Sequence, residues 1–137
     1  MALYYADASA LVKLILDEPE SDALRRFLVE SDLVSSELVL TEAPRAVRRA
    51  TAAGRRLSLD RLLERTDETL DAVALVPVDR DLLLTAGSLD EPAIRALDAI
   101  HICSALVALP HNGVVTYDER QAAVARLAGL RTVAPGA

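Results

Sequence analysis

Two aspartates stand where an apolar stretch should give way to a helix. Asp7 lies in YYADASALVK, after a short apolar run, and Asp118 takes the same relative position in VVTYDERQ. In open α/β sheets the ligand crevice lies outside the carboxyl ends of the strands, so acids contributed by two strands can face one crevice. Each acid alone could equally be the N-cap of the following helix. Their joint occurrence favours a shared site over two independent caps.

A third acid, Asp98, interrupts the apolar helical segment IRALDAIHICSAL. A lone carboxylate on such a helix costs free energy to bury, so it must lie at an exposed edge, pair with a cation or bind a metal. Arg95, one helical turn earlier, is the available cation. This stretch by itself leaves the ion pair and the metal ligand equally open.

The fourth acid is Glu42, in SSELVLTEAPRAVRR. Arg45 and Arg49 fall on its helical face, so Glu42 could form a salt bridge with them. It could also be an acidic ligand at the rim of a cleft, with the arginines reaching for phosphates. Taken alone, the stretch favours the salt bridge.

Apolar periodicity predicts that strands and helices alternate along the chain. The expected strands are residues 2–6, 33–36, 74–78, 113–117 and 131–134. The expected helices span about residues 9–16, 17–31, 36–54, 58–72, 79–89, 93–109 and 118–130. Pro44 should start a new turn or kink the third helix. Such alternation is typical of parallel strand pairing and predicts an α/β sandwich.

The composition fits one domain with an aliphatic core. The chain has 137 residues, of which 52% are hydrophobic and only 3% aromatic, with no tryptophan. It begins with no basic, apolar leader, contains no apolar stretch of membrane-spanning length, and has a single cysteine, Cys103. These features predict a cytoplasmic protein without a membrane segment or an internal disulfide.

The charge distribution is uneven. A net charge of −6 argues against nucleic-acid binding, because affinity for phosphates rests mainly on lysine and arginine. Residues 45–56, RAVRRATAAGRR, nevertheless hold five of the fourteen arginines and no acid. This segment is the candidate footprint for a polyanion.

Four segments together resemble the signature blocks of PIN-domain nucleases: YADASALVKL, SSELVLTEAPRAVRR, RALDAIHICSAL and VVTYDERQAAVARLAGL. They occur in the order and approximate spacing of that family and cover essentially the whole chain, with the VapC toxins of toxin–antitoxin pairs as the nearest likeness. The resemblance implies a single PIN-like nuclease domain over residues 1–137. Its fold would be a three-layer α/β/α sandwich with a central, mostly parallel sheet.

The resemblance also implies a function and partners. The chain would be a metal-dependent endoribonuclease that cleaves RNA with Mg²⁺ or Mn²⁺, is held in check by a cognate antitoxin and forms a homodimer. Carried over position by position, the acids that serve as metal ligands and catalytic residues are Asp7, Glu42, Asp98 and Asp118, and the polar helpers are Ser9 and Thr116. Arg45, Arg48 and Arg49 are the candidate RNA contacts. Mg²⁺ prefers oxygen ligands, and such an ion can activate water and offset charge on a leaving oxygen.

Two rival functions stay open. A phosphoryl-transfer enzyme could use Asp7 as an aspartyl-phosphate nucleophile, but phosphatases of that kind place a second acid where Ser9 stands, and receiver domains need an acidic pair. A non-catalytic binding module of the same fold is the other rival, although all four acids are present. An RNA cleavage assay with and without metal separates these classes.

Other polar residues have simpler interpretations. We expect His101 to be a core histidine with a backbone partner, Cys103 to serve packing, and Asp79 to cap the helix that follows it. Glu119, next to Asp118, could compete with that acid or assist it.

Overall fold

The structure is a computed structural model that describes residues 1–54 and 58–137. The elements follow in the order β1 (Ala2–Ala6), α1 (Ala8–Ile15), α2 (Ser21–Phe27), β2 (Ser31–Ser36), α3 (Val39–Ala52), α4 (Leu59–Asp71), β3 (Val73–Val76), α5 (Arg80–Gly87), α6 (Ala96–Val107), β4 (Val114–Val115), α7 (Glu119–Leu127) and β5 (Thr132–Val133). Each expected strand and helix is therefore present, with ends that differ by a few residues.

The five strands form one sheet in the order β3-β2-β1-β4-β5, and every pair is parallel. β1 lies at the centre, where Tyr5 pairs with Val34 of β2 on one side and Val114 of β4 on the other. Because β1 and β4 are parallel neighbours, their carboxyl ends meet at the same edge of the sheet. Asp7 and Asp118 follow these two strands, so the topology brings both acids to that edge.

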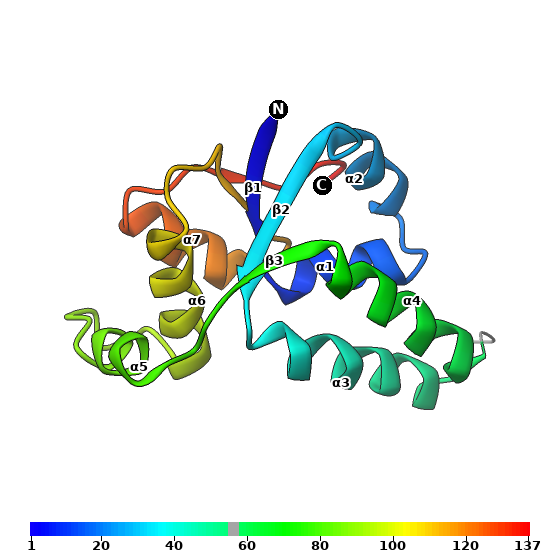
Figure 1. Cartoon of the computed structure of the whole chain (residues 1–137), viewed down its shortest axis with the longest axis horizontal. Helices are drawn as coiled ribbons and strands as arrows, with labels where there is room; N and C mark the ends of the chain where they lie inside the picture. The colour runs from blue at the N-terminus through cyan, green and yellow to red at the C-terminus, as the bar shows by residue number, and fades with distance from the viewer. Residues whose placement is uncertain (55–57) are drawn as a thin grey trace.

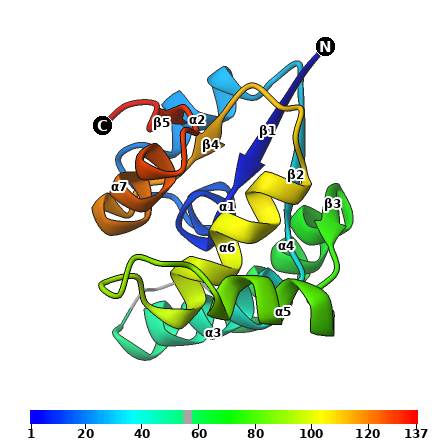
Figure 2. The same ribbon diagram turned by 90° about the vertical axis from the view of Figure 1, so that its left-hand side faces the viewer.

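Helices cover both faces of the sheet, which confirms the predicted α/β/α sandwich (Figure 1). Successive residues of a strand point to opposite faces, and β1 shows this with its two tyrosines. Tyr4 packs in the core beneath α1, α2, α3 and α4, whereas Tyr5 packs in the core beneath α5, α6 and α7. Figure 2 faces the second layer and shows α6 lying in front of the strands.

Several expectations about local structure are now settled. Asp79 caps α5 by accepting a hydrogen bond from Leu82 N at 2.9 Å, and Cys103 is buried in the core, as predicted. α3 runs on through Pro44 without ending. The missing N–H of Pro44 would have bonded the carbonyl of Leu40, which lies in the first turn at a half-exposed position that water can reach.

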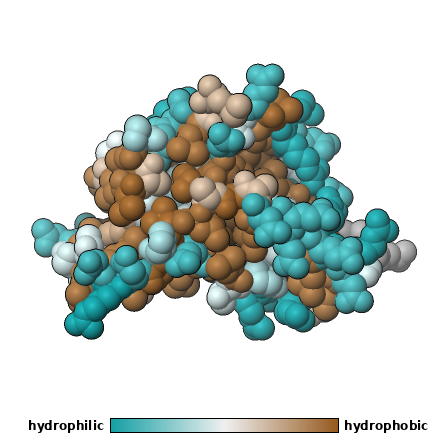
Figure 3. Space-filling model, viewed as in Figure 1, coloured by the Kyte–Doolittle hydropathy of each residue, from teal (hydrophilic) through white to brown (hydrophobic). Residues whose placement is uncertain are grey.

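The surface combines charged helices with open apolar areas. Hydrophilic side chains cover α4, whereas hydrophobic residues lie exposed over the strands in the middle of the face in Figure 3. Within residues 1–54 and 58–137, no helix is long and apolar enough to cross a membrane.

Candidate active site

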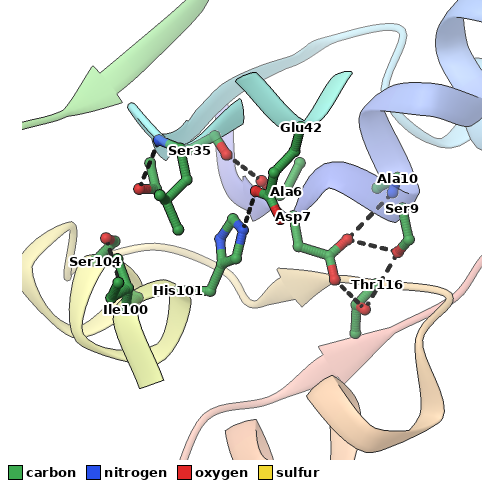
Figure 4. A network of polar contacts seen from close by, with 12 residues as sticks. Ala6, Asp7, Ser9, Ala10, Ser35, Glu42, Ile100, His101, Ser104 and Thr116 are labelled. Atoms are coloured by element: carbon green, nitrogen blue, oxygen red, sulfur yellow. Dashed lines mark hydrogen bonds and ion pairs between the residues drawn. The ribbon is translucent and has the colours of Figure 1, made fainter. Parts of the chain in front are cut away.

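Asp7 is both a helix cap and a buried acid. It links β1 to α1, and its Oδ1 accepts hydrogen bonds from Ala10 N at 3.2 Å and from the Ser9 hydroxyl at 2.6 Å. Its Oδ2 accepts a short hydrogen bond from the hydroxyl of Thr116 (Figure 4). Only 4% of the residue is exposed. The two alternatives for this position, a cap and a site residue, are therefore compatible, because the carboxylate has two oxygens.

Ser9 and Thr116 tie the first and last acids together. The Ser9 hydroxyl, besides donating to Asp7, accepts from Tyr117 N at 2.8 Å. The Thr116 hydroxyl accepts from Asp118 N at 3.1 Å. These two hydroxyls fix the loop after β4 against the start of α1, which positions Asp7 and Asp118 relative to one another.

Asp118 caps α7. Its Oδ1 accepts from Arg120 N at 2.9 Å and from Gln121 N at 3.1 Å. Glu119, the adjacent acid, is exposed and is the first residue of α7. It lines a cavity that Asp118 and Arg126 line as well.

Asp98 lies in the first turn of α6 with 15% of its side chain exposed. Its Oδ2 is buried and makes no hydrogen bond to any described residue. The cation nearest to it is Arg120, whose Nε lies 3.5 Å away, rather than Arg95, the partner that the helical spacing indicated. Arg120 comes from α7, so this contact between two helices could not be read from spacing along one of them.

Glu42 bonds to a histidine instead of an arginine. Its Oε1 lies 2.7 Å from Nε2 of His101 (Figure 4), and the Tyr5 hydroxyl lies 2.7 Å from Nδ1 of the same ring. His101 is buried, as expected, but the prediction of a backbone partner was wrong. Both of its ring nitrogens contact side chains because β1 and α3 approach α6 at this point.

All four acids line one cavity of about 400 Å³. Its lining also includes Ser9, His101, Arg95 and Arg120. Arg120 was not among the residues singled out from the sequence. Its position two residues after Asp118, at the start of the helix that this acid caps, is the signal that could have identified it.

Crowding and burial disfavour the charged form of two of these acids. Burial raises the pKa of Asp7 above its ordinary value, although hydrogen bonds from Ser9 and Thr116 oppose the rise. Burial also raises the pKa of Asp98, and the charge of Asp118 adds to that rise while Arg120 opposes it. A cation in the cavity would favour the ionised forms.

The four carboxylates line the same cavity, but they are too far apart to bind one ion together as the side chains lie. Among the described residues, no three side chains of histidine, cysteine, aspartate or glutamate are grouped closely enough to hold one ion. Glu42 is engaged by His101, and Oδ2 of Asp98 lies 3.5 Å from Nε of Arg120. Holding a cation would require the carboxylates to move closer together, and Oδ2 of Asp98 accepts no hydrogen bond from a described residue that would have to be given up.

A second cavity, of about 580 Å³, adjoins the first. The two share Ala8, Ser9, Glu42 and Leu97 in their linings. Arg45 and Arg49 line the second cavity, but Arg48 does not. Arg55 and Arg56, the remaining arginines of the predicted polyanion footprint, lie outside the described residues.

Lys13 reaches the second cavity from α1, but its charge is engaged. Its Nζ lies 2.8 Å from Glu20 and 3.6 Å from Glu18, and 4.9 Å above the ring of Tyr117. The two arginines of α3 therefore supply the positive charge that faces this cavity on the α3 side.

The chain is similar in sequence to known proteins of one family. A sequence model of the PIN domain family matches residues 4–127. Ribonuclease VapC46 of Mycobacterium tuberculosis is 38% identical over 141 aligned residues, which cover 98% of this chain and 99% of the relative. Ribonuclease VapC35 of the same species is 36% identical and covers 98% of each chain.

Solved structures share the fold at low sequence identity. Mycobacterium tuberculosis VapC20, described as a sarcin-ricin loop cleaving toxin, matches with a TM-score of 0.69 at 19% identity, over 96% of this chain and 99% of its own. VapBC2 from Rickettsia felis, bound to a DNA fragment from its promoter, matches with a TM-score of 0.70 at 15% identity, over 97% and 98%. With its family match and with relatives 32–38% identical over nearly their full length, this chain belongs to the PIN domain family, among its VapC-type members.

Proposed function

We propose that this protein is a metal-dependent endoribonuclease, the toxin of a VapBC-type pair, and that it cleaves RNA in the four-acid cavity with Mg²⁺ or Mn²⁺. The observation that supports this most strongly is the convergence of Asp7, Glu42, Asp98 and Asp118, from four separate segments, on one cavity next to two arginines. The relatives named as ribonucleases, 32–38% identical, support the substrate class.

The donor set of the cavity suits a hard cation. Carboxylate and hydroxyl oxygens predominate there, and Mg²⁺ prefers oxygen ligands. The buried Oδ2 of Asp98 accepts no hydrogen bond from the described part of the chain, and Nε of Arg120 is 3.5 Å away, so a divalent cation could bind this oxygen more closely than the arginine does. Asp98 would thus be a ligand, together with Asp7, Glu42 and Asp118.

The remaining residues orient the acids and the RNA. A bound divalent ion supplies charge stabilisation and an activated water. Ser9 and Thr116 hold the Asp7 carboxylate by hydrogen bonds to its two oxygens, so that its orientation is fixed before substrate arrives. Arg45 and Arg49 would bind phosphates of the RNA in the adjoining cavity, and Arg120 would offset negative charge beside Asp98.

The phosphoryl-transfer alternative fits less well. Ser9, whose hydroxyl donates to Asp7 at 2.6 Å, stands where phosphatases that use an aspartyl-phosphate place a second acid. The non-catalytic binding module has the same fold, so only an activity measurement distinguishes it from the nuclease.

The test is to incubate the purified chain with a mixture of structured RNAs in millimolar Mg²⁺ or Mn²⁺ and, separately, in chelator. Cleavage that appears only with metal supports the proposal, and binding without cleavage in either condition contradicts it.

Two arginines of α3 are expected to contribute to RNA affinity. We expect Arg45→Gln and Arg49→Gln to weaken binding to all RNA sequences alike, because phosphate contacts carry no sequence information. Each should lower the salt slope of binding by roughly 0.7 for single-stranded RNA, the effect of one lost phosphate contact. Affinity measured across a salt series with catalytically inactive protein checks this.

Arg48→Gln is the matched control, because Arg48 lies on the same helix and is exposed, but does not line the cavity. It should leave affinity and salt slope nearly unchanged. If all three variants behave like the parent, the arginines do not contact RNA and serve another surface of the protein.

The proposal extends to partners and location. An antitoxin protein would be the partner, by analogy with the VapBC2 assembly, and the apolar residues exposed on the surface offer area for it and for a homodimer. Exposed examples are Phe27 of α2 and Leu40 of α3. The protein would act in the cytoplasm, where its RNA substrate is found.

A further inference from the structure

Three side chains form a continuous hydrogen-bonded chain behind the acid cavity. Tyr5 of β1 is fully buried, and its hydroxyl lies 2.7 Å from Nδ1 of His101 on α6. Nε2 of His101 lies 2.7 Å from Oε1 of Glu42 on α3. His101 is 4% exposed, whereas the side chain of Glu42 is 25% exposed, so the chain leads from the core to the cavity.

The direction of the hydrogen bonds follows from the Glu42 end. An ionised carboxylate only accepts hydrogen bonds, so Nε2 of His101 carries the hydrogen and donates it. In the neutral ring Nδ1 is then an acceptor, and the Tyr5 hydroxyl donates to it. Burial raises the pKa of Tyr5 well above its ordinary value, so this hydroxyl keeps its proton. Ser35 and Ser104, which lie beside Tyr5, donate their own hydrogens to the carbonyls of Ala6 and Ile100.

The hydrogen bond from His101 restricts the conformations open to the Glu42 side chain. A glutamate side chain has several rotatable bonds, and fixing them costs conformational entropy each time it must hold a ligand. With Oε1 held by a buried ring that is itself held by Tyr5, part of that ordering is already present in the metal-free protein. α6 therefore contributes twice to the cavity, since Asp98 lies one helical turn before His101.

We propose that His101 is a positioning residue that presents the Glu42 carboxylate to the cation, and that Tyr5 holds its ring as the Nε2–H tautomer. This inference rests on the proposed function, because it requires that the cavity bind a divalent ion. Partners of this kind, which orient a ligating carboxylate, typically contribute 10–100-fold to metal affinity. His101 itself does not touch the cation or the RNA.

The test measures Mn²⁺ affinity of the full chain by calorimetry or electron paramagnetic resonance, without RNA. We expect His101→Leu to weaken Mn²⁺ binding roughly 10–100-fold. His101→Gln should recover most of that loss, because its amide N–H can replace Nε2–H as the donor to Glu42. Tyr5→Phe should weaken binding in the same direction but by less.

Tyr4→Phe is the matched control. Tyr4 is the neighbouring residue of β1, but it faces the opposite core, where its ring packs against Phe27 with centroids 5.1 Å apart. It should bind Mn²⁺ like the parent. If His101→Leu does not fold, the Mn²⁺ affinities of Tyr5→Phe and Tyr4→Phe test the inference instead, since both variants keep an aromatic ring in place.

Nitrogen chemical shifts of the His101 ring in the metal-free protein give a second readout, independent of metal. The parent should show the Nε2–H tautomer, and Tyr5→Phe should show a mixture of tautomers. A parent ring that carries its hydrogen on Nδ1 and not on Nε2, or folded His101 and Tyr5 variants that bind Mn²⁺ as tightly as the parent, would overturn the inference while leaving the proposed function intact. If the parent itself binds no Mn²⁺, the proposed function fails and this inference fails with it.

Discussion

Asp98→Asn is expected to lower the rate of metal-dependent RNA cleavage by at least about 100-fold, the loss typical of removing one group that stabilises transition-state charge. Asparagine keeps the shape of the side chain and one oxygen, but it lacks the charge that would hold the cation. The measurement is the cleavage rate of parent and variant at saturating Mg²⁺, with circular dichroism to verify the fold. Asp79→Asn is the control, because Asp79 is likewise an aspartate at the start of a helix but does not line the acid cavity.

The same variant separates a functional acid from a structural one. Burial and the neighbouring Asp118 raise the pKa of Asp98 in the folded state, so the metal-free fold binds this proton more tightly than the unfolded chain does. The contribution of Asp98 to stability must therefore fall as pH rises from the ordinary value of 3.8 through the higher folded-state pKa. The Asp98→Asn variant has no titrating carboxyl at this position, so its stability does not fall with pH for this reason.

Denaturant unfolding across pH, in chelator, checks this expectation. The variant should gain stability relative to the parent as pH rises through that window, and the difference should level off above it. Loss of the contact with Arg120 should cost little, because that arginine is 47% exposed. A variant that is much less stable at neutral pH and still cleaves RNA at the parental rate would show that Asp98 serves an ion pair and not a metal.

Metal binding itself should stabilise the folded protein. If Mg²⁺ or Mn²⁺ binds only the folded state, the free energy of unfolding should rise by about 2.7 kcal/mol at a concentration of 100 times the dissociation constant. For a domain of this size that corresponds to an increase in melting temperature of roughly 10 °C. The physical reason is that the cation favours the ionised forms of Asp7 and Asp98, whose pKa values burial raises in its absence. Thermal unfolding followed during a metal titration provides the measurement.

Asp98→Asn and Asp79→Asn again form the informative pair in this titration. The first should show a much smaller shift in melting temperature at the same metal concentration, and the second should follow the parent. A melting temperature that stays constant up to millimolar metal in well-folded parent protein would count against a cation site formed by the four acids.

The sequence was sufficient to predict the order of the elements and the location of two acids. Hydrophobic periodicity is a local property, so it identified every strand and helix, although β4 and β5 proved to be only two residues long each. Because the strands alternate with helices, parallel pairing followed, and with it the expectation that acids after two strands share one edge. Asp7 and Asp118 lie at the carboxyl ends of β1 and β4, which are neighbours in the sheet.

Only the tertiary structure decided which side chains contact one another across elements. Spacing along a helix suggested Arg95 as the partner of Asp98 and arginines as the partners of Glu42. The fold instead brings Arg120 to Asp98 and His101 to Glu42. These contacts join α6 to α7 and α3 to α6, and helical periodicity describes neighbours on one helix but not the packing of two.

The same limit applies to His101 and to the arginines of α3. The sequence indicated that His101 would be buried, but its partners Tyr5 and Glu42 lie 96 and 59 residues away along the chain. Arg45, Arg48 and Arg49 are equivalent in charge, and only the packing of α3 against the rest of the domain turns two of them toward the cavity. The sequence by itself thus predicted which residues would carry the proposed metal-dependent chemistry and on which elements they lie. The tertiary structure decided their partners, because contacts between distant segments depend on how whole helices pack on the sheet.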